Sequence, residues 1–317
     1  MSRRMHVTEG PFAPPVARRE LTVTSADGSR LHVEVHGPDD APTVVLIHGW
    51  TCSTAFWAPV VRDLAADHRV VAYDQRGHGR SPAPGSSGGY STTALADDLG
   101  AVLQATLRPG ERAVLAGHSM GAMTLLAAAD RPYLHERAAA LLLCSTGASR
   151  LAGESQVIPL PGAGPRALAH RALLHSRLPL GPVNAVTRSV LHYATMGPGA
   201  SREARNACAA IVHACPPKVR GAWGRVLAGL DLEAEVRRLR VPTAVIQGTA
   251  DRLTPMVHAR RIEAGLPENL GLAEQPGLGH MTPMEAPDVV SGSIRTLVKD
   301  YLPTTAASGA AVEEETA

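Results

Sequence analysis

Short, continuous apolar runs recur along the chain, and stretches with a helical pattern separate them. The runs are rich in aliphatic residues, which is the pattern of strands buried on both faces of a parallel sheet. Five runs have this character: Thr43–Ile47, Arg69–Tyr73, Ala113–Ala116, Ala140–Cys144 and Thr243–Ile246. A further strand-like segment covers Gly271–Glu274.

The two N-terminal segments follow a different pattern. Leu21–Thr24 and Leu31–Val35 alternate apolar and polar positions around the turn pair Asp27-Gly28, which predicts a β-hairpin. Between the later runs, apolar residues recur at spacings of three to four, which predicts helices. The helical stretches are Ala55–Ala66, Thr93–Leu107 and Met120–Ala129. Alternating β and α units predict an α/β fold with helices on both sides of a doubly wound, mostly parallel sheet.

The alternation lapses over residues 147–222, which are rich in Pro and Gly and contain no convincing buried strand. Pieces such as Ala167–Leu174 and Val183–Tyr193 are apolar enough to pack, so an inserted helical cap fits better than a linker. The expected organisation is an N-terminal extension, a core in two parts around the cap, and a disordered tail. Their bounds are 1–20, 21–146 with 223–302, and 303–317.

Composition narrows the class of protein only slightly. A net charge of +2 over 317 residues gives little reason to expect a nucleic-acid partner. The N-terminus lacks the apolar stretch of a signal peptide, and no window of about 20 apolar residues predicts a membrane anchor. The four cysteines share no CxxC spacing. A cytoplasmic protein with reduced thiols is expected, and a homodimer is among the assemblies left open.

The strongest chemical signal is the sequence Gly117-His118-Ser119-Met120-Gly121, a G-x-S-x-G between an apolar strand and a helical run. Small residues at both ends allow a tight strand-to-helix turn that leaves the central side chain projecting above the sheet edge. The hydroxyl also lies at a helix N-terminus, which favours developing negative charge. A simple N-capping serine is the plainer alternative. We interpret Ser119 as a nucleophile.

A serine hydroxyl needs a base, and the base needs an orienting acid. His280 follows a strand-like segment within a Gly-rich loop, which lets its imidazole turn back over the sheet edge. Asp251 follows the strand Thr243–Ile246, at the carboxyl edge where catalytic groups of parallel sheets gather. A surface histidine and a turn aspartate are the alternatives. Asp231 and Asp288 are weaker candidates for the acid because no strand precedes them.

An oxyanion hole requires two backbone N–H groups aimed at one point. Met120, directly after the nucleophile, supplies the first, and Trp50 in the loop after the strand Thr43–Ile47 supplies the second, with Thr51 next. Several neighbouring residues, together with Tyr193 of the cap and Trp223 directly after it, are candidates for the substrate pocket, although core packing is the commoner fate of an aromatic side chain. They are His48, Gly49, Phe56, Trp57, His118, Tyr193 and Trp223.

These motifs together resemble the α/β-hydrolase superfamily. The match comprises the loops around Trp50, Ser119, Asp251 and His280, together with Asp74–Ser81, and spans roughly residues 20–302. The order Ser, Asp, His is that of the family. The resemblance implies an eight-stranded sheet, a variable cap, and a structural role for Asp74–Ser81.

The resemblance implies a serine hydrolase that cleaves a carboxylic ester, or a related acyl bond, of a small and largely apolar substrate through an acyl-enzyme. No cofactor is implied, and the cap histidines His170, His175, His192 and His213 lack metal-site spacing. Haloalkane dehalogenases and epoxide hydrolases are disfavoured because they place an aspartate at the position of Ser119. Carbon–carbon hydrolases, lyases and perhydrolases of the same fold stay open, as does a small-molecule receptor.

Overall fold

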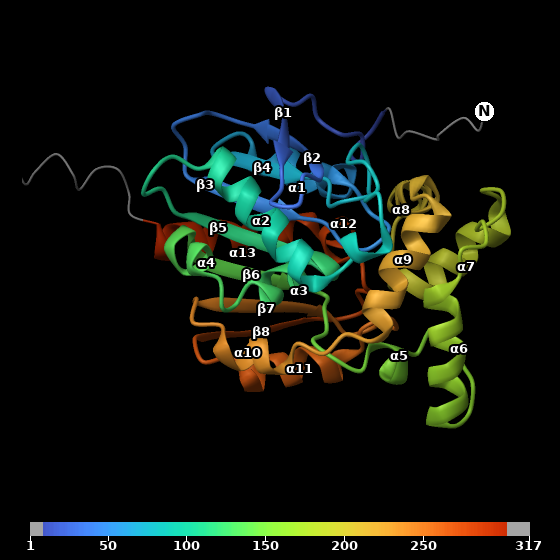
Figure 1. Ribbon diagram of the computed structural model, residues 1–317. Helices are drawn as coiled ribbons and strands as arrows, with labels where there is room; N and C mark the ends of the chain where they lie inside the picture. The colour runs from blue at the N-terminus through green and yellow to red at the C-terminus, as the bar shows by residue number, and fades with distance from the viewer. Residues whose placement is uncertain (1–8, 303–317) are drawn as a thin grey trace, which may run out of the picture.

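The computed structural model describes residues 9–302, so the expected tail and the first eight residues lie outside the described part. One eight-stranded sheet runs through the molecule (Figure 1), in the order β1-β2-β4-β3-β5-β6-β7-β8. The strands are β1 (Arg19–Thr24), β2 (Arg30–His36), β3 (Thr43–Ile47), β4 (Arg69–Tyr73), β5 (Ala113–His118), β6 (Ala138–Cys144), β7 (Thr243–Gly248) and β8 (Asn269–Gln275).

The sheet is mostly parallel, as predicted. β2 pairs antiparallel with both β1 and β4, and all later neighbours are parallel. The hairpin β1–β2 turns at Gly28, whose φ of 81° is accessible to glycine without strain. β8 contains the strand-like segment expected at Gly271–Glu274; it forms one edge of the sheet, and none of its residues is fully buried.

Each buried strand serves two cores because successive side chains point to opposite faces of the sheet. In β3, Val45 and Ile47 pack into one core, whereas Val44 and Leu46 pack into the other. The first core is covered by α2 (Thr92–Thr106), α3 (Met120–Ala127), α4 (Pro132–Arg137), α10 (Glu233–Arg238) and α11 (Met256–Gly265). The second is covered by η1 (Thr54–Trp57), α1 (Ala58–Leu64), α12 (Thr282–Glu285) and α13 (Pro287–Tyr301). A short helix, η2 (Ser87–Gly89), precedes α2.

A group of helices interrupts the alternation between β6 and β7 and lies beyond one end of the sheet (Figure 1). They are α5 (Leu151–Glu154), α6 (Ala163–His175), α7 (Ala185–Thr195), α8 (Arg202–Ala214) and α9 (Pro217–Ala228). We call residues 151–228 the helical insertion. It occupies the region expected to form the cap, and the boundary expected at residues 222/223 falls inside α9.

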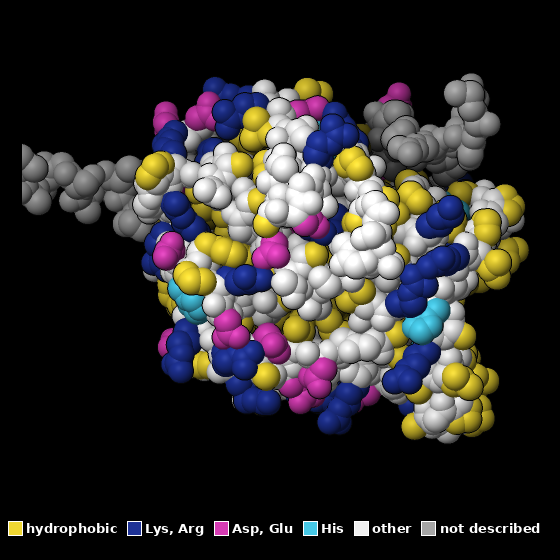
Figure 2. Space-filling view, viewed as in Figure 1, with side chains coloured by type: hydrophobic (Ala, Val, Ile, Leu, Met, Phe, Trp, Pro, Cys, Tyr) yellow, Lys and Arg dark blue, Asp and Glu magenta, His cyan; other side chains and the backbone are white. Residues whose placement is uncertain are grey.

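The helical insertion is less completely packed than the sheet. Large apolar side chains stay exposed on it, including Leu168, Leu178 and Val186, and Figure 2 shows apolar atoms gathered over this part of the surface. Within residues 9–302, none of the helices is both long enough and apolar enough to cross a membrane.

Candidate active site

Ser119 lies in the turn between β5 and α3 with a φ of 51°, in the left-handed region that costs a non-glycine residue roughly 1 kcal/mol or more. The glycines beside it are sterically required. A Cβ on Gly121 would lie 2.1 Å from the Ile47 carbonyl oxygen, and one on Gly117 would lie 2.5 Å from the Ala122 nitrogen. The chain therefore makes the sharp turn predicted from the motif, and Ser119 follows the carboxyl end of β5.

Asp251 and His280 come together from the loops after β7 and β8. The His280 Nδ1 atom lies 2.8 Å from the Asp251 Oδ2 atom, and both side chains are buried. This contact orients the imidazole and directs its Nε2 atom away from the carboxylate. The pair has the geometry of a base and its orienting acid.

The Asp251 carboxylate is held by more groups than the sequence indicated. Its Oδ1 atom accepts hydrogen bonds from the Leu253 and Thr254 N–H groups, and its Oδ2 atom accepts bonds from Gln247 Nε2 and Thr254 Oγ1. Burial alone would raise the pKa of Asp251, but the charge and hydrogen bond of His280, with the Thr254 bonds, lower it. The acid is therefore ionised at neutral pH.

The loop that carries His280 is attached to the helical insertion. Thr195, the last residue of α7, accepts a hydrogen bond from the His280 N–H through its carbonyl oxygen, at 2.9 Å. Glu285 accepts bonds from the N–H groups of Gly279, Met281 and Gly197, the last at 2.7 Å. The position of the candidate base thus depends on both the core and the insertion.

His118 packs beside this loop and is held neutral by burial. Its Nε2 atom lies 2.8 Å from the His280 carbonyl oxygen, which makes Nε2 the protonated nitrogen. Its ring stacks on Phe56 with 4.4 Å between the centroids. Burial sets the pKa of His118 well below its usual value. His118 therefore supports the His280 loop as an uncharged donor.

The two expected oxyanion donors have free N–H groups. Neither Trp50 nor Met120 donates a backbone hydrogen bond to any acceptor within residues 9–302. Thr51, the second choice, has a φ of 64° and donates its N–H to His78 Nε2 at 3.2 Å. Burial lowers the pKa of His78 to about 4, so at neutral pH it is an uncharged acceptor. The Thr51 N–H is therefore occupied, whereas the backbone N–H of Trp50 has no acceptor within the described residues.

His48 and Gly49 form the support of this loop. Gln75 donates its backbone N–H to His48 Nε2 at 3.0 Å, while His48 Nδ1 lies 2.8 Å from the Gly49 carbonyl oxygen. Burial lowers the pKa of His48 to about 3. A Cβ on Gly49 would lie 2.7 Å from His118 Nδ1, so this position requires glycine. These contacts fix the loop without placing either residue against a ligand.

A cavity of about 260 Å³ lies between the core and the helical insertion. Ser119, His280, Trp50 and His118 line it together with Arg220 of α9. The remaining wall is mainly aliphatic, with leucines from α5, α6, α7 and α9. Within the described residues the Ser119 hydroxyl makes no hydrogen bond to His280, which is common in sites without substrate.

Most of the expected pocket residues lie elsewhere. Phe56, Trp57 and Trp223 are fully buried in the cores, and the Trp223 indole donates to the Arg76 carbonyl oxygen at 3.1 Å. Tyr193 is 43% exposed and packs against Arg252 on the outside. Among these candidates only His118 lines the cavity, because three of the aromatic side chains pack in the cores and Tyr193 lies outside.

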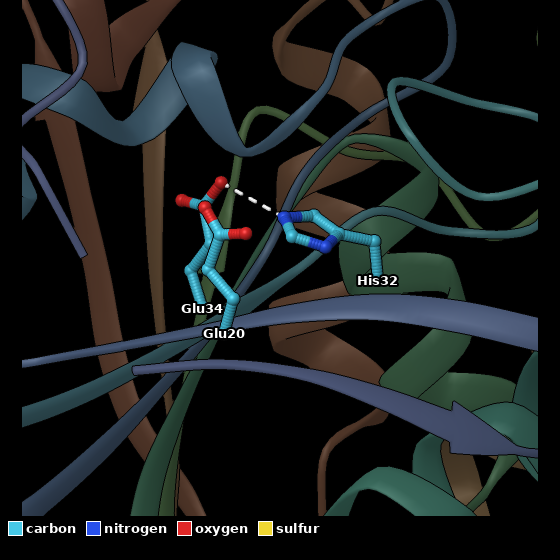
Figure 3. A group of neighbouring side chains, drawn as sticks. All are labelled: Glu20, His32 and Glu34. Carbon is cyan, nitrogen blue, oxygen red and sulfur yellow. Dashed lines mark hydrogen bonds and ion pairs between the residues drawn. The ribbon is translucent and has the colours of Figure 1, made fainter. Parts of the chain in front are cut away.

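One group in the described residues has the spacing of metal ligands, and it lies on β1 and β2 away from the cavity. In Figure 3 the carboxylates of Glu20 and Glu34 lie side by side with the His32 ring pointing at Glu34. Both acids already have partners: Arg80 pairs with Glu20 at 2.6 Å, and His32 lies 3.1 Å from Glu34. This group is accounted for by ion pairing.

Comparison with known proteins agrees with this geometry. The sequence profile of the α/β hydrolase fold family matches residues 42–287, so the chain belongs to that family. A putative carbamate hydrolase, RutD, from Variovorax paradoxus (strain S110) is 33% identical over 252 residues, which are 79% of this chain and 89% of the relative. A non-heme chloroperoxidase from Streptomyces lividans is 27% identical over 292 residues, covering 88% of this chain and 99% of the relative.

Solved structures share the whole architecture. The esterase RhEst1 from Rhodococcus sp. ECU1013 superposes with a TM-score of 0.73 at 25% identity, over 89% of this chain and 99% of that one. The overall fold of this chain is thus similar to that of a solved esterase. The relatives' names include hydrolases of different bonds, so the family alone leaves the substrate open.

Proposed function

We propose that the protein is a serine hydrolase that cleaves a carboxylic ester of a small, largely apolar substrate. The observation that carries this proposal is the Asp251–His280 pair, whose histidine lines the same cavity as Ser119 in its strained turn. The aliphatic wall of that cavity suits an acyl chain. A cavity of about 260 Å³ is close to the lower end of small-molecule sites, which span roughly 300–1,000 Å³.

The first half of the reaction forms an acyl-enzyme. His280 Nε2 takes the Ser119 proton while the serine oxygen bonds to the ester carbonyl carbon. The negative charge on the carbonyl oxygen is stabilised by the N–H groups of Trp50 and Met120. The carbon–oxygen bond to the alcohol then breaks, and the alcohol leaves with the proton from His280.

The second half uses the same groups in reverse. His280 removes a proton from water, which attacks the acyl carbon, and Ser119 leaves with that proton as the carboxylic acid is released. Asp251 stays ionised throughout and stabilises the imidazolium, which agrees with the lowered pKa of its carboxyl group. No cofactor is needed for either half.

Replacement of the nucleophile tests this proposal. Ser119→Ala should lower kcat for a p-nitrophenyl ester by about 10³-fold or more, because the acyl-enzyme cannot form. Ser293→Ala is the matched control, since its hydroxyl donates to a carbonyl oxygen within α13, away from the cavity. Comparable turnover by Ser119→Ala and the unaltered protein would refute the role of Ser119.

A second activity deserves measurement because one relative is named a non-heme chloroperoxidase. Attack of hydrogen peroxide in place of water on the acyl-enzyme would release a peracid, with the same proton transfer through His280. Product analysis with peroxide present separates hydrolysis from perhydrolysis. A receptor without turnover would instead leave Ser119 unlabelled by a fluorophosphonate probe.

The proposal includes a reducing compartment such as the cytoplasm. The four cysteines, Cys52, Cys144, Cys208 and Cys215, are free and buried, and burial raises the pKa of each thiol. Buried, protonated thiols fit a protein that needs no disulfide for its stability.

A further inference from the structure

Arg220 is the one formally charged side chain, histidines aside, in the lining of the described cavity. It lies in the first turns of α9, and only 6% of the residue is exposed. Its carbonyl oxygen accepts a hydrogen bond from the Trp50 indole at 3.1 Å, so Arg220 is attached to the residue that provides a proposed oxyanion donor. A buried cation therefore faces the same space as Ser119.

The Arg220 guanidinium makes few hydrogen bonds within the described residues. The Leu178 carbonyl oxygen accepts a hydrogen bond from Arg220 Nη2, and within residues 9–302 the guanidinium has no other acceptor and no carboxylate partner. Burial lowers the pKa of Arg220, yet a guanidinium stays protonated at neutral pH. Within residues 9–302 no Arg220 nitrogen is both fully buried and without a partner, so the rest of the guanidinium stays accessible and can bind an anion from outside the chain.

The surroundings of Arg220 favour such an anion. The described lining contains no aspartate or glutamate, and the rest of it is mainly aliphatic with some serine, threonine and histidine side chains. A low-dielectric cavity with a single cation concentrates anionic ligands, because field lines are focused there and no acid in the lining competes. The expectation of a largely apolar substrate therefore leaves out one charged group of the cavity, the Arg220 guanidinium.

We propose that the substrate carries a free carboxylate that pairs with Arg220, so that the preferred ester is a half-ester of a dicarboxylic acid. This inference rests on the proposed ester hydrolysis and deepens it. One guanidinium matches the single charge of a carboxylate, and its planar donors suit the two carboxylate oxygens. A phosphate dianion would bring a second negative charge that no group in the lining balances.

Matched esters test the proposal. p-Nitrophenyl hemiglutarate and p-nitrophenyl pentanoate have acyl chains of similar length, but only the first ends in a carboxylate. We expect the unaltered protein to show the higher kcat/KM for hemiglutarate, mainly through a lower KM. Arg220→Gln should reduce the ratio of the two kcat/KM values by roughly 10- to 100-fold, because a charge-assisted hydrogen bond is lost.

Two further variants guard against a merely structural effect. Arg220→Lys keeps the charge without the planar donors and should give an intermediate ratio. Arg225→Gln, an exposed position on the same helix, should leave the ratio unchanged. A ratio that is the same in the unaltered protein and Arg220→Gln would overturn the inference, as would an equal loss for both esters.

A binding experiment separates this inference from the proposed function. Calorimetry with the Ser119→Ala protein should show binding of monomethyl glutarate, at least tenfold weaker binding of dimethyl glutarate, and loss of the difference on adding Arg220→Gln. If no ester is hydrolysed but this pattern appears, ester hydrolysis fails and the carboxylate site stands. If esters are hydrolysed and both glutarates bind equally, the carboxylate site fails alone.

Discussion

Two buried arginines, one in the core and one in the helical insertion, have opposite surroundings. Arg76 follows β4 and bonds through its guanidinium to Asp98, with Nε 2.7 Å from Oδ2, and to Asp27 at 2.8 Å. Arg220 has no carboxylate partner within the described residues and faces the cavity. The first charge is neutralised by the chain itself, whereas the second is available to a ligand.

The difference between Arg76 and Arg220 shows that a buried arginine can either stabilise the fold or stay open to a ligand. Burial alone would lower the pKa of Arg76, but the hydrogen bonds and charges of Asp98 and Asp27 raise it. Arg76 also donates to the carbonyl oxygens of Gly89 and Ala94, so it joins the loop after β4 to α2. A self-contained network of this kind braces the fold, whereas the incompletely bonded Arg220 is the group for which we propose a ligand.

The largest expected loss of stability comes from replacing Arg76, the arginine that is paired with acids. Arg76→Met should lower the free energy of unfolding by about 3–5 kcal/mol, because Asp98 is left buried without its counter-charge. Urea denaturation of the purified variant measures this loss. Adding Asp98→Asn to Arg76→Met should recover part of it, since no unpaired charge is then buried. A loss below about 1 kcal/mol for Arg76→Met would contradict the bracing role.

A smaller effect is expected from the unpaired arginine. Arg220→Gln should change the free energy of unfolding by no more than about 1 kcal/mol, because it removes one hydrogen bond to a carbonyl oxygen and leaves no acid unpaired. The same denaturation experiment provides the comparison. A loss as large as that of Arg76→Met would show that Arg220 holds the insertion in place rather than a ligand.

The smallest expected effect concerns how the stability of the fold depends on pH. The Arg76 hydrogen bond is the main cause that lowers the pKa of Asp27 to about 2. Because this folded-state value lies below the unfolded value of about 3.9, Asp27 stabilises the fold above that pH. The contribution is lost as the pH falls from about 4 to about 2. The half-exposed side chain keeps the contribution small.

Carbon-detected NMR titration of the Asp27 carboxyl group measures this value directly. The midpoint should stay near 2 in Arg220→Gln, because that arginine lies in the insertion and has no bond to Asp27. A midpoint near the ordinary value for aspartate in the unaltered protein would show that Arg76 and Asp27 are not paired in solution.

Much of the fold could be predicted because the physical cause is local. Aliphatic runs such as Thr43–Ile47 mark strands covered on both faces, and the glycines around Ser119 mark a turn that admits no side chain. The Asp251–His280 contact followed from one further rule, that the carboxyl ends of parallel strands meet at one edge. Each of these predictions depends only on residues that are neighbours in the sequence or on the order of the strands.

The cavity wall could not be predicted because it depends on how separate helices pack. Phe56 and Trp57 looked like pocket residues, yet η1 turns both into the core. Arg220 has no distinguishing feature in an arginine-rich sequence, and its position beside the cavity and the Trp50 loop emerges only from the packing of α9. The contact between Thr254 and Asp251 could have been predicted more easily, because a spacing of three residues is that of an aspartate-capped turn.

The junction between α7 and the His280 loop has a consequence for protein engineering. Gly197 and Gly279 approach so closely that a Cβ on Gly279 would lie 2.3 Å from the Gly197 nitrogen, and Glu285 bonds to both backbones. If helices of the insertion are exchanged to change the substrate range, residues 195–197 of this chain must therefore be kept, because they contact the His280 loop. The exchangeable module ends before Thr195, and any graft that extends further also replaces a support of His280.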